Sequence, residues 1–248
     1  MHANPSIRCC GDSAITVEFG QKICVEENQK VMSLHTYLTH ERPNGVIETV
    51  PCYSSLMIHY DPCLISYEEL HKKIRYALQH LSKTTVQSSS VISIPVLYGG
   101  EFGPDLEEVA AYEQITPEEV IHRHTTYDCY VYMLGFSPGN AYIGCPERIF
   151  SVPRKSTPRL KIPAGAITIW ESQTTIFPME QPGGWNVIGN TPLRMFDLSC
   201  QEPFFLHPSQ RVHFRAITEA EYQDIASRVA CHTYQPEEYR PQGAAYDH

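Results

Sequence analysis

The sequence predicts two domains of different architecture, an α+β domain at the N-terminus and a mainly-β domain after it. In the first, helix-like and strand-like apolar patterns alternate, whereas in the second, short apolar runs are separated by turns rich in proline and glycine. The second pattern is typical of a β-barrel or a β-sandwich. We place the domains at residues 1–85 and 91–234, followed by a flexible polar tail at residues 235–248.

The N-terminal domain is predicted to contain an antiparallel sheet with helices on one side of it. Strands are expected at residues 14–19, 46–50 and 54–60. The first helix carries Val31, Leu34 and Leu38 on one face. The second begins after Ser66, and Glu69 completes the pattern of a capping box. A strand-helix-strand-strand-helix order favours a small α+β sandwich.

The C-terminal domain is predicted to open with a strand and two short helices. A serine-rich stretch at residues 83–90 precedes it and resembles an interdomain linker. The first helix is expected over residues 103–113. The second has Thr116 as its N-cap, Pro117 at the first helical position and Glu119 at the capping-box position.

The remainder of this domain is predicted to consist of short strands followed by one helix. Strands are expected at residues 91–97, 130–134, 166–170, 174–177, 185–188 and 211–214. The last helix starts at Thr218, is capped with Glu221 and ends near Ala230. Regularly spaced short strands with turn signals indicate a barrel or sandwich and not a parallel sheet.

Charge and composition disfavour several classes of protein. The formal net charge of -9 disfavours nonspecific binding to nucleic acid or anionic membranes, because both attract cationic surfaces. No apolar run is long enough to span a bilayer, and the N-terminus lacks the pattern of a secretion signal. We therefore expect a cytoplasmic protein that binds neither nucleic acid nor membranes.

The nine cysteines are predicted to be reduced thiols. They are scattered without a Cys-x-x-Cys pair, which removes the basis for a zinc ribbon or a thioredoxin-like redox site. Only Cys9 and Cys10 are adjacent, and a vicinal disulfide is the alternative there. No histidine pair with metal-ligand spacing is present, so no metal site is predicted.

Residues 135–139 read Gly-Phe-Ser-Pro-Gly and match the G-x-S-x-G nucleophile elbow of α/β-hydrolases. In that elbow, the residue after the serine donates its backbone N–H to the oxyanion hole. Here that residue is Pro138, which has no N–H, and the residues that follow are a poor helix start. A turn at Ser137 is predicted instead of a catalytic nucleophile.

The stretch from Val152 to Pro192 is the most unusual part of the chain. Its prolines fix backbone angles, and its glycines allow a ligand or another backbone to come close. Arg154 and Arg159 each follow a proline, and arginines held in this way suit bidentate contact with carboxylate or phosphate. The alternative is that both arginines bind neighbouring acids or turn carbonyls.

Two further features bear on catalysis. His124 follows a predicted helix, although a lone histidine is more often structural than catalytic. The acidic residues Glu101, Asp105, Glu107 and Glu108 fit a helix N-terminus, where the helix dipole favours negative charge, and metal binding by them is the less supported alternative. Neither a P-loop nor a G-x-G-x-x-G motif occurs, so any nucleotide must be handled by another arrangement or by a partner.

A series of ordered motifs gives a specific resemblance. Residues 98–107 read YGGEFGPDLE, residues 130–139 read YVYMLGFSPG, and residues 141–144 read AYIG. Pro-Arg, Pro-Ala-Gly, Gln-Thr, Pro-Gly-Gly-Trp and Gly-Asn-Thr-Pro elements follow in that order. With N-terminal elements such as Gly11-Asp12-Ser13-Ala14, the motifs cover nearly the whole chain. The sequence resembles the allophanate hydrolase subunit 1 family, also called the KipI or PxpB family.

The resemblance implies a cyclophilin-like β-barrel behind a smaller α+β domain. Family members form one subunit, PxpB, of bacterial ATP-dependent 5-oxoprolinase, which opens 5-oxo-L-proline to L-glutamate, so partner subunits A and C are implied, with ATP and Mg²⁺. Activity is expected only in that complex. The candidate catalytic residues are Arg154, Arg159 and His124, and the candidate substrate-binding residues are Tyr142, Gln173, Gly183, Gly184 and Trp185.

Two other functions are compatible with the resemblance. One relative inhibits a sporulation histidine kinase, so a regulatory binding protein without turnover is the first alternative. The second is a carboxyltransferase-like subunit that uses biotin chemistry. The family pattern has an aromatic residue, a small Ala-Gly pair, a glycine and an arginine where this chain has Asn140, Trp170, Thr175 and Asn190. These departures slightly favour the regulatory alternative.

Overall fold

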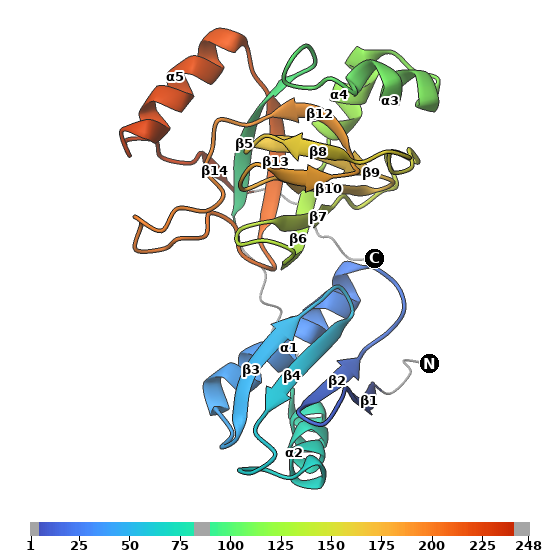
Figure 1. The fold of residues 1–248 in the computed structure, drawn as a ribbon, viewed down its shortest axis with the longest axis vertical. Coiled ribbons are helices and arrows are strands. Elements are labelled where there is room, and N and C mark those ends of the chain that lie inside the picture. The colour runs from blue at the N-terminus through green and yellow to red at the C-terminus, as the bar shows by residue number, and fades with distance from the viewer. Residues whose placement is uncertain (1–4, 82–89, 241–248) are drawn as a thin grey trace. The chain divides into compact units, whose positions relative to one another are not determined.

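The computed structural model describes residues 5–81 and 90–240, and the chain divides into two compact units between residues 87 and 88 (Figure 1). The predicted boundaries are residues 85 and 91. The predicted serine-rich linker lies outside the described residues, apart from Ser90.

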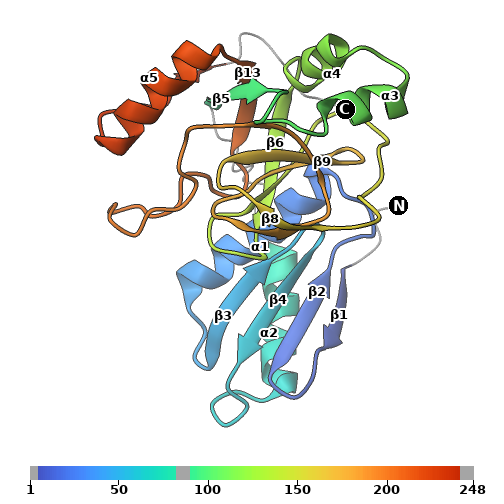
Figure 2. The same ribbon diagram turned by 45° about the horizontal axis from the view of Figure 1, so that its top comes forward.

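The N-terminal unit contains a four-stranded antiparallel sheet with both helices on one face (Figure 2). Its elements are β1 (Ser6–Cys9), β2 (Ala14–Glu18), α1 (Val25–Glu41), β3 (Val46–Pro51), β4 (Ser55–Tyr60) and α2 (Tyr67–His80). The strand order is β1-β2-β4-β3. Apolar residues of β2, β4 and the two helices form one core, as predicted. Edge strand β1 was not predicted, because it is short and only partly buried.

The predicted capping box at the start of α2 is confirmed. The backbone N–H of Glu69 donates to Ser66 Oγ at 3.3 Å, and the backbone N–H of Ser66 donates to Glu69 Oε2 at 3.0 Å. These bonds satisfy two N–H groups that have no partner inside the helix. The cap fixes the start of the helix, so that Leu70, Ile74 and Ala77 face the core.

The C-terminal unit is a closed barrel of seven strands, which confirms the predicted mainly-β fold. The strands are β5 (Val91–Tyr98), β6 (Asp128–Leu134), β7 (Ala141–Gly144), β9 (Ala166–Trp170), β10 (Gln173–Ile176), β12 (Asn186–Asn190) and β13 (Arg211–Ala216). Their order is β5-β12-β9-β10-β7-β6-β13, and β13 pairs with β5 to close the barrel. That last pair is parallel, and the other neighbours are antiparallel.

Apolar side chains fill the barrel, and a smaller sheet covers part of its outer face. Phe214 and four isoleucines inside the barrel are almost fully buried: Ile94, Ile143, Ile167 and Ile169. The smaller sheet pairs β8 (Arg159–Ile162) with β11 (Gln181–Gly183). Ile162 of this sheet packs with Phe177 and Val187 in a second, small core. The outer face is therefore partly covered where the Pro-Arg segment crosses it.

Three helices complete the described part of this unit: α3 (Leu106–Glu113), α4 (Pro117–His124) and α5 (Glu219–Ala230). Thr116 caps α4 as predicted, since its Oγ1 accepts the backbone N–H of Glu119 at 3.2 Å. The predicted capping box there is not completed, because the Glu119 carboxylate accepts from Arg123 Nε at 2.9 Å instead. The box of Thr218 and Glu221 is confirmed. Among the described residues, no helix combines the length and apolar character needed to cross a membrane.

The first of these helices begins later than predicted, at Leu106 instead of residue 103. Gly103 packs directly against a neighbouring strand, where a Cβ atom would lie 2.0 Å from the backbone oxygen of Ile188. The glycine is therefore required for close approach of two backbones and does not start the helix.

Residues 235–240 were predicted to belong to a flexible tail, and the structure corrects this. A short strand, β14 (Glu238–Tyr239), pairs with the start of β5, and the backbone N–H of Ser93 donates to Glu237 O at 2.8 Å. The hydroxyl of Tyr239 also donates to the Asp128 carboxylate. A short exposed edge strand needs no apolar alternation, so its polar composition concealed it. Residues 241–248 lie outside the described residues.

The cysteines also need a correction, because Cys129 and Cys145 form a disulfide. Cys129 lies on β6 and Cys145 directly follows β7, the neighbouring antiparallel strand, in which Gly144 is the register partner of Tyr130. A cross-strand pair depends on strand register, which the spacing of cysteines alone does not show. The other seven cysteines are free, including the adjacent Cys9 and Cys10.

Candidate active site on the outer face of the barrel

Arg154 lies on a segment that is tied to several parts of the barrel. Backbone atoms on both sides of it form hydrogen bonds: Glu171 N–H to Val152 O (2.9 Å), Asn186 Nδ2 to Pro153 O (2.9 Å) and Lys155 N–H to Gly184 O (2.8 Å). Pro153 further restricts the backbone just before the arginine. These contacts hold the backbone of Arg154 in place while its side chain stays exposed.

The guanidinium of Arg154 lies over two indole rings. Its Cζ is 4.2 Å from the ring centroid of Trp170 and 5.8 Å from that of Trp185. The two indole centroids are 5.5 Å apart, and Tyr142 packs edge-on against Trp185 at 6.2 Å. A cation over an aromatic face gains about 0.5–1 kcal/mol at an exposed site. We refer to Arg154, Tyr142, Trp170 and Trp185 as the aromatic–arginine cluster.

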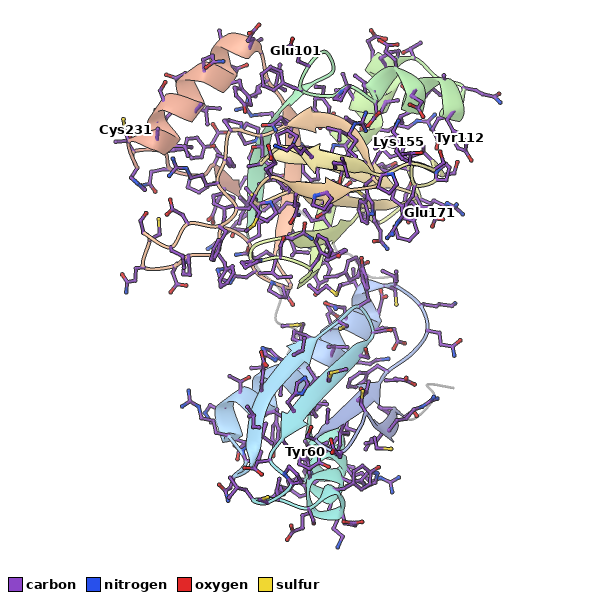
Figure 3. All side chains as sticks on the ribbon, viewed as in Figure 1. Tyr60, Glu101, Tyr112, Lys155, Glu171 and Cys231 are labelled. Carbon is purple, nitrogen blue, oxygen red and sulfur yellow. A yellow bond between two sulfur atoms is a disulfide. The ribbon has the colours of Figure 1, made fainter. Side chains whose placement is uncertain are left out.

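The cluster belongs to the outer face of the barrel. Along β9, Ile169 points inward and is fully buried, so Trp170 in the next position points outward. Gln173 is the register partner of Trp170 across the tight turn between β9 and β10. Figure 3 shows Glu171, in that turn, on the same side of the barrel as Lys155. Three of the predicted site residues, Arg154, Tyr142 and Trp185, thus lie together, with Gln173 close in register.

Arg154 is the cation of this segment that remains for a ligand. Among described residues, its guanidinium has no ion pair with a carboxylate, whereas Lys155 and Arg159 bind Asp105, and Lys161 binds Glu180 at 3.1 Å. Burial raises the pKa of the Tyr142 hydroxyl, and the charge of Arg154 offsets this only in part. An anion with a planar group fits such a surface, since the guanidinium supplies charge and the rings supply flat apolar faces.

Arg159 has a different setting, because it binds the buried carboxylate of Asp105. Arg159 Nη1 and Nη2 donate to the two carboxylate oxygens at 2.6 and 2.7 Å. Lys155 Nζ is 2.6 Å from Oδ1, and the backbone N–H of Val187 donates to Oδ2 at 2.7 Å. Burial alone would raise the pKa of Asp105, but these donors more than offset it, so the pKa is lowered. Arg159 therefore binds an acidic side chain of this chain, which was the alternative to ligand binding for this arginine.

The two predicted substrate-binding glycines differ in their surroundings. A Cβ atom on Gly183 would lie 2.8 Å from the Phe177 ring and 2.9 Å from Ile162, so this glycine is needed for packing. A Cβ atom on Gly184 would make only ordinary contacts, the nearest at 3.6 Å from Pro158. Gly184 contributes through its carbonyl oxygen, which fixes the segment that carries Arg154.

His124 lies inside the barrel and is not part of the cluster. Its Nδ1 is 2.7 Å from the hydroxyl of Tyr98, its Nε2 is 3.1 Å from Thr174 Oγ1, and its ring packs on Phe214 at 4.3 Å between centroids. The side chain is fully buried, and this burial lowers its pKa to about 3. The ring is therefore neutral near physiological pH, and in this structure it cannot reach a ligand on the outer face.

His124→Gln is expected to flatten the pH dependence of stability below pH 6.5. The pKa of His124 is about 3 in the folded protein and near 6.5 in the unfolded chain, so the unfolded state binds one more proton between these values. The free energy of unfolding then falls by up to about 1.4 kcal/mol per pH unit as the pH drops below the unfolded pKa, and is unaffected above it. Urea unfolding on both sides of pH 6.5 measures this slope.

The matched control for this experiment is His40→Gln, because the side chain of His40 is 85% exposed. It should keep the wild-type slope. A slope in His124→Gln as steep as in the wild type would contradict a neutral, buried His124.

Ser137 lies in the turn between β6 and β7, as predicted. The backbone N–H of Gly135 donates to Asn140 O at 3.0 Å, and that of Asn140 donates to Ser137 O at 3.1 Å. A strand beginning at Ala141 follows, where a nucleophile elbow would require a helix. The G-x-S-x-G match therefore marks a turn.

The positions that depart from the family pattern have partners of their own. Thr175 Oγ1 donates to Asn140 Oδ1 at 3.3 Å, so two of the altered residues bind each other. Asn190 accepts from the hydroxyl of Tyr222 at 2.7 Å. Trp170, the fourth, belongs to the aromatic–arginine cluster. Each of these four altered residues therefore has a contact of its own in the folded chain.

Three residues of this region escaped prediction as members of the site: Asp105, Lys155 and Trp170. Asp105 was noted only as part of an acidic helix opening, and Trp170 only as a departure from the family pattern. Closure of the barrel brings Asp105 to Lys155 and Arg159, and no local sequence signal indicates contacts between such distant positions. The alternation along residues 166–170, with Ile167 and Ile169 on the other face, was the available sequence signal for the outward direction of Trp170.

Comparison with known proteins identifies the family. Residues 5–206 match the family model described as the carboxyltransferase domain, subdomain C and D. The chain belongs to this family. It is 39% identical to the second (B) subunit of the Bacillus subtilis 5-oxoprolinase over 86% of this chain and 92% of that protein. The corresponding subunit of Escherichia coli O157:H7 is 33% identical over 82% of this chain and 92% of its own length. The KipI/PxpB family predicted from the motifs is thereby confirmed.

Solved structures agree with this assignment. The protein TTHA0988 superposes with a TM-score of 0.74 at 32% identity and covers 86% of this chain, which spans 40% of that longer protein. PH0987 of Pyrococcus horikoshii is 40% identical, with a TM-score of 0.53, over 88% of this chain and all of its own. The urea amidolyase of Kluyveromyces lactis has a TM-score of 0.79 over 96% of this chain and 16% of its own. At 17% identity, that likeness concerns the fold alone.

Proposed function

We propose that this chain is the PxpB component of an ATP-dependent 5-oxoprolinase, acting with subunits A and C to open 5-oxo-L-proline to L-glutamate. The observation that carries the proposal is the 39% identity to the corresponding 5-oxoprolinase component of Bacillus subtilis, which extends over 92% of that protein. The aromatic–arginine cluster supports it, because the substrate is a small, planar ring that bears a carboxylate.

The chemistry requires a stronger electrophile than a lactam carbonyl. Transfer of the γ-phosphoryl group of ATP to the lactam oxygen gives ADP and a carbon that water can attack. Addition of one water and cleavage of the C–N bond open the ring and leave an acyl phosphate. A second water then releases phosphate and L-glutamate. Negative charge develops on oxygens near the ring in these steps, so a fixed cation beside them lowers the barrier.

Arg154 is the residue that we assign to this charge. It is cationic, its backbone is held on both sides, and its side chain is exposed above the rings of Trp170 and Trp185. The lactam ring can pack beside the guanidinium against the part of Trp170 that stays exposed. Arg159 is assigned a positioning role, because both of its terminal nitrogens are already bound to Asp105.

The charges of this segment support dependence on partner subunits. A nucleoside triphosphate with Mg²⁺ needs several cationic or backbone donors around its phosphates. Among the described residues from 152 to 162, Lys155, Arg159 and Lys161 are all paired with carboxylates, which leaves Arg154 alone. We therefore assign most of the ATP site to a partner subunit or to an interface with one.

Reconstitution tests the proposed function. Subunits A and C are assayed for ATP-dependent release of glutamate from 5-oxoproline, with this chain supplied or omitted. Turnover that requires the chain is the expected result. Equal turnover with and without it rules the proposal out. Inhibition of a histidine kinase by a chain that does not support turnover would instead establish the regulatory alternative.

A further inference from the structure

We propose that Asp197, Cys200 and His232 form a binding site for a divalent metal ion, Zn²⁺, separate from the aromatic–arginine cluster. Each offers one ligand atom, and the carboxylate oxygen, thiol sulfur and ring nitrogen all lie within 4.8 Å of one another. Ligand atoms around a tetrahedral zinc ion are about 3.5 Å apart, given bond lengths of about 2.0–2.3 Å. Small rotations of these side chains, two of which are exposed, therefore complete the site.

Two segments of the C-terminal unit hold the three ligands. Asp197 and Cys200 lie on one loop, in which Asp197 N–H donates to Pro203 O at 2.9 Å and Cys200 N–H donates to Asp197 O at 3.2 Å. His232 comes just after α5 and has a left-handed backbone, with φ of 54°. Figure 3 shows Cys231, the residue before it, at the end of α5. A bound ion would therefore link the loop to the end of the helix.

The three ligands line a common cavity of about 250 Å³. Glu202 also lines it, but only Asp197, Cys200 and His232 have ligand atoms within 4.8 Å of one another, so water is expected at the fourth position of a tetrahedral ion. The donor set selects the metal, because Mg²⁺ and Ca²⁺ prefer oxygen ligands, whereas zinc accepts nitrogen, sulfur and oxygen together. One carboxylate and one thiolate also balance the charge of a divalent ion, with the histidine neutral.

The carboxylate of Asp197 is already oriented by neighbours that leave it able to bind. Ser199 donates to Oδ1 through its backbone N–H at 2.9 Å and its hydroxyl at 2.6 Å, and Arg194 donates to Oδ2 at 3.1 Å. Each carboxylate oxygen can accept more than one partner, so these bonds do not use up its capacity. Hydrogen bonds of this kind orient the ligands of known metal sites.

This proposal goes beyond the sequence-based expectation of no metal site. The expectation rested on the absence of familiar ligand spacings, and Asp-x-x-Cys with a distant histidine is not one of them. The fold supplies the histidine by placing the end of α5 beside the loop that carries Asp197.

Metal titration of the full chain tests the site. Tag-free protein stripped with a chelator is titrated with ZnCl₂ by calorimetry and with Co²⁺ in an absorption experiment. The variants Asp197→Asn, Cys200→Ser and His232→Ala should each weaken zinc binding by at least ~10-fold, and Cys200→Ser should abolish the thiolate-to-cobalt charge-transfer band. Matched controls are Asp224→Asn, Cys231→Ser and His207→Ala, which should bind like the wild type.

Several outcomes overturn the site. One is a wild type that binds no zinc, and another is a Cys200→Ser variant that binds as tightly as the wild type. A Cys231→Ser variant that loses as much affinity as Cys200→Ser also overturns it, because it moves the thiol ligand to the neighbouring residue. Circular dichroism establishes that each variant is folded. None of these readouts depends on 5-oxoproline turnover, so failure of the metal site and failure of the proposed function are distinguishable.

Discussion

Asp105→Ala is expected to lower the free energy of unfolding of the C-terminal unit by about 3 kcal/mol. The substitution removes the shared partner of Arg159 and Lys155 and leaves the backbone N–H of Val187 without its acceptor. Loss of one partner from a buried ion pair costs about 3–5 kcal/mol. The lower end applies here, because 34% of the Arg159 side chain stays in contact with solvent, which screens part of its charge.

The two tryptophans of the chain make this measurement specific. Trp170 and Trp185 both lie in the C-terminal unit, so their fluorescence during urea unfolding reports on that unit. Asp224→Asn is the matched control, because it breaks an exposed pair with Arg228 at 3.6 Å and should cost less than about 1 kcal/mol. Equal stability of the Asp105 and Asp224 variants would show that the buried network does not stabilise the fold.

The same network predicts a pH dependence with a definite sign. The pKa of Asp105 is lowered in the folded protein, so its contribution to stability is fully present above the ordinary pKa of 3.8. It is lost as the pH falls through the lowered, folded-state pKa. The difference in unfolding free energy between wild type and Asp105→Ala should therefore shrink only in acid below pH 3.8. A difference that shrinks between neutral pH and pH 3.8 would point to another group.

Elements with a strong local signal were predictable from the sequence. Each capping box, at Ser66 and at Thr218, is a motif of four consecutive residues that marks where its helix starts. Strand β9 likewise has the predicted bounds. The strands that were missed in the C-terminal unit, β7, β8, β11 and β14, are each two to four residues long. Each of these strands depends on a partner strand: barrel strands for β7 and β14, and each other for β8 and β11. Short apolar runs do not indicate such pairings.

The residues of the candidate site were likewise predictable only where a local sequence signal or a family motif marks them. Arg154 was predictable because its proline neighbour is a local signal for a fixed backbone, and Trp185 because it belongs to a family motif. His124 was predicted as a site residue but lies inside the barrel. It is the last residue of α4, and the polar sequence at the end of this helix does not show that the side chain is buried. Asp105 was beyond reach for a similar reason, because its partners come from a segment that only the closed barrel brings near.

Arg154→Ala is expected to lower kcat/KM of the reconstituted complex by about 100-fold, if the chain acts as the proposed 5-oxoprolinase component. Removal of one group that stabilises a developing oxyanion typically costs a factor of about 10²–10³ in rate. Arg154→Lys keeps the charge but loses the planar, bidentate geometry and much of the stacking on Trp170, so an intermediate loss is expected. Lys161→Ala, which removes an exposed cation paired with Glu180, is the matched control and should retain wild-type turnover.

Three comparisons decide what an effect at Arg154 means. Loss of the cation–π contact costs no more than about 1 kcal/mol, so the alanine variant should remain folded, and a large loss of turnover cannot be attributed to unfolding. A fall in kcat places the arginine against charge that appears only in the transition state, whereas a rise in KM alone assigns it to binding of the substrate carboxylate. Unchanged values of both would remove Arg154 from the reaction. Catalysis would then have to rely on groups of the partner subunits, because the neighbouring cations Lys155 and Arg159 are held by Asp105.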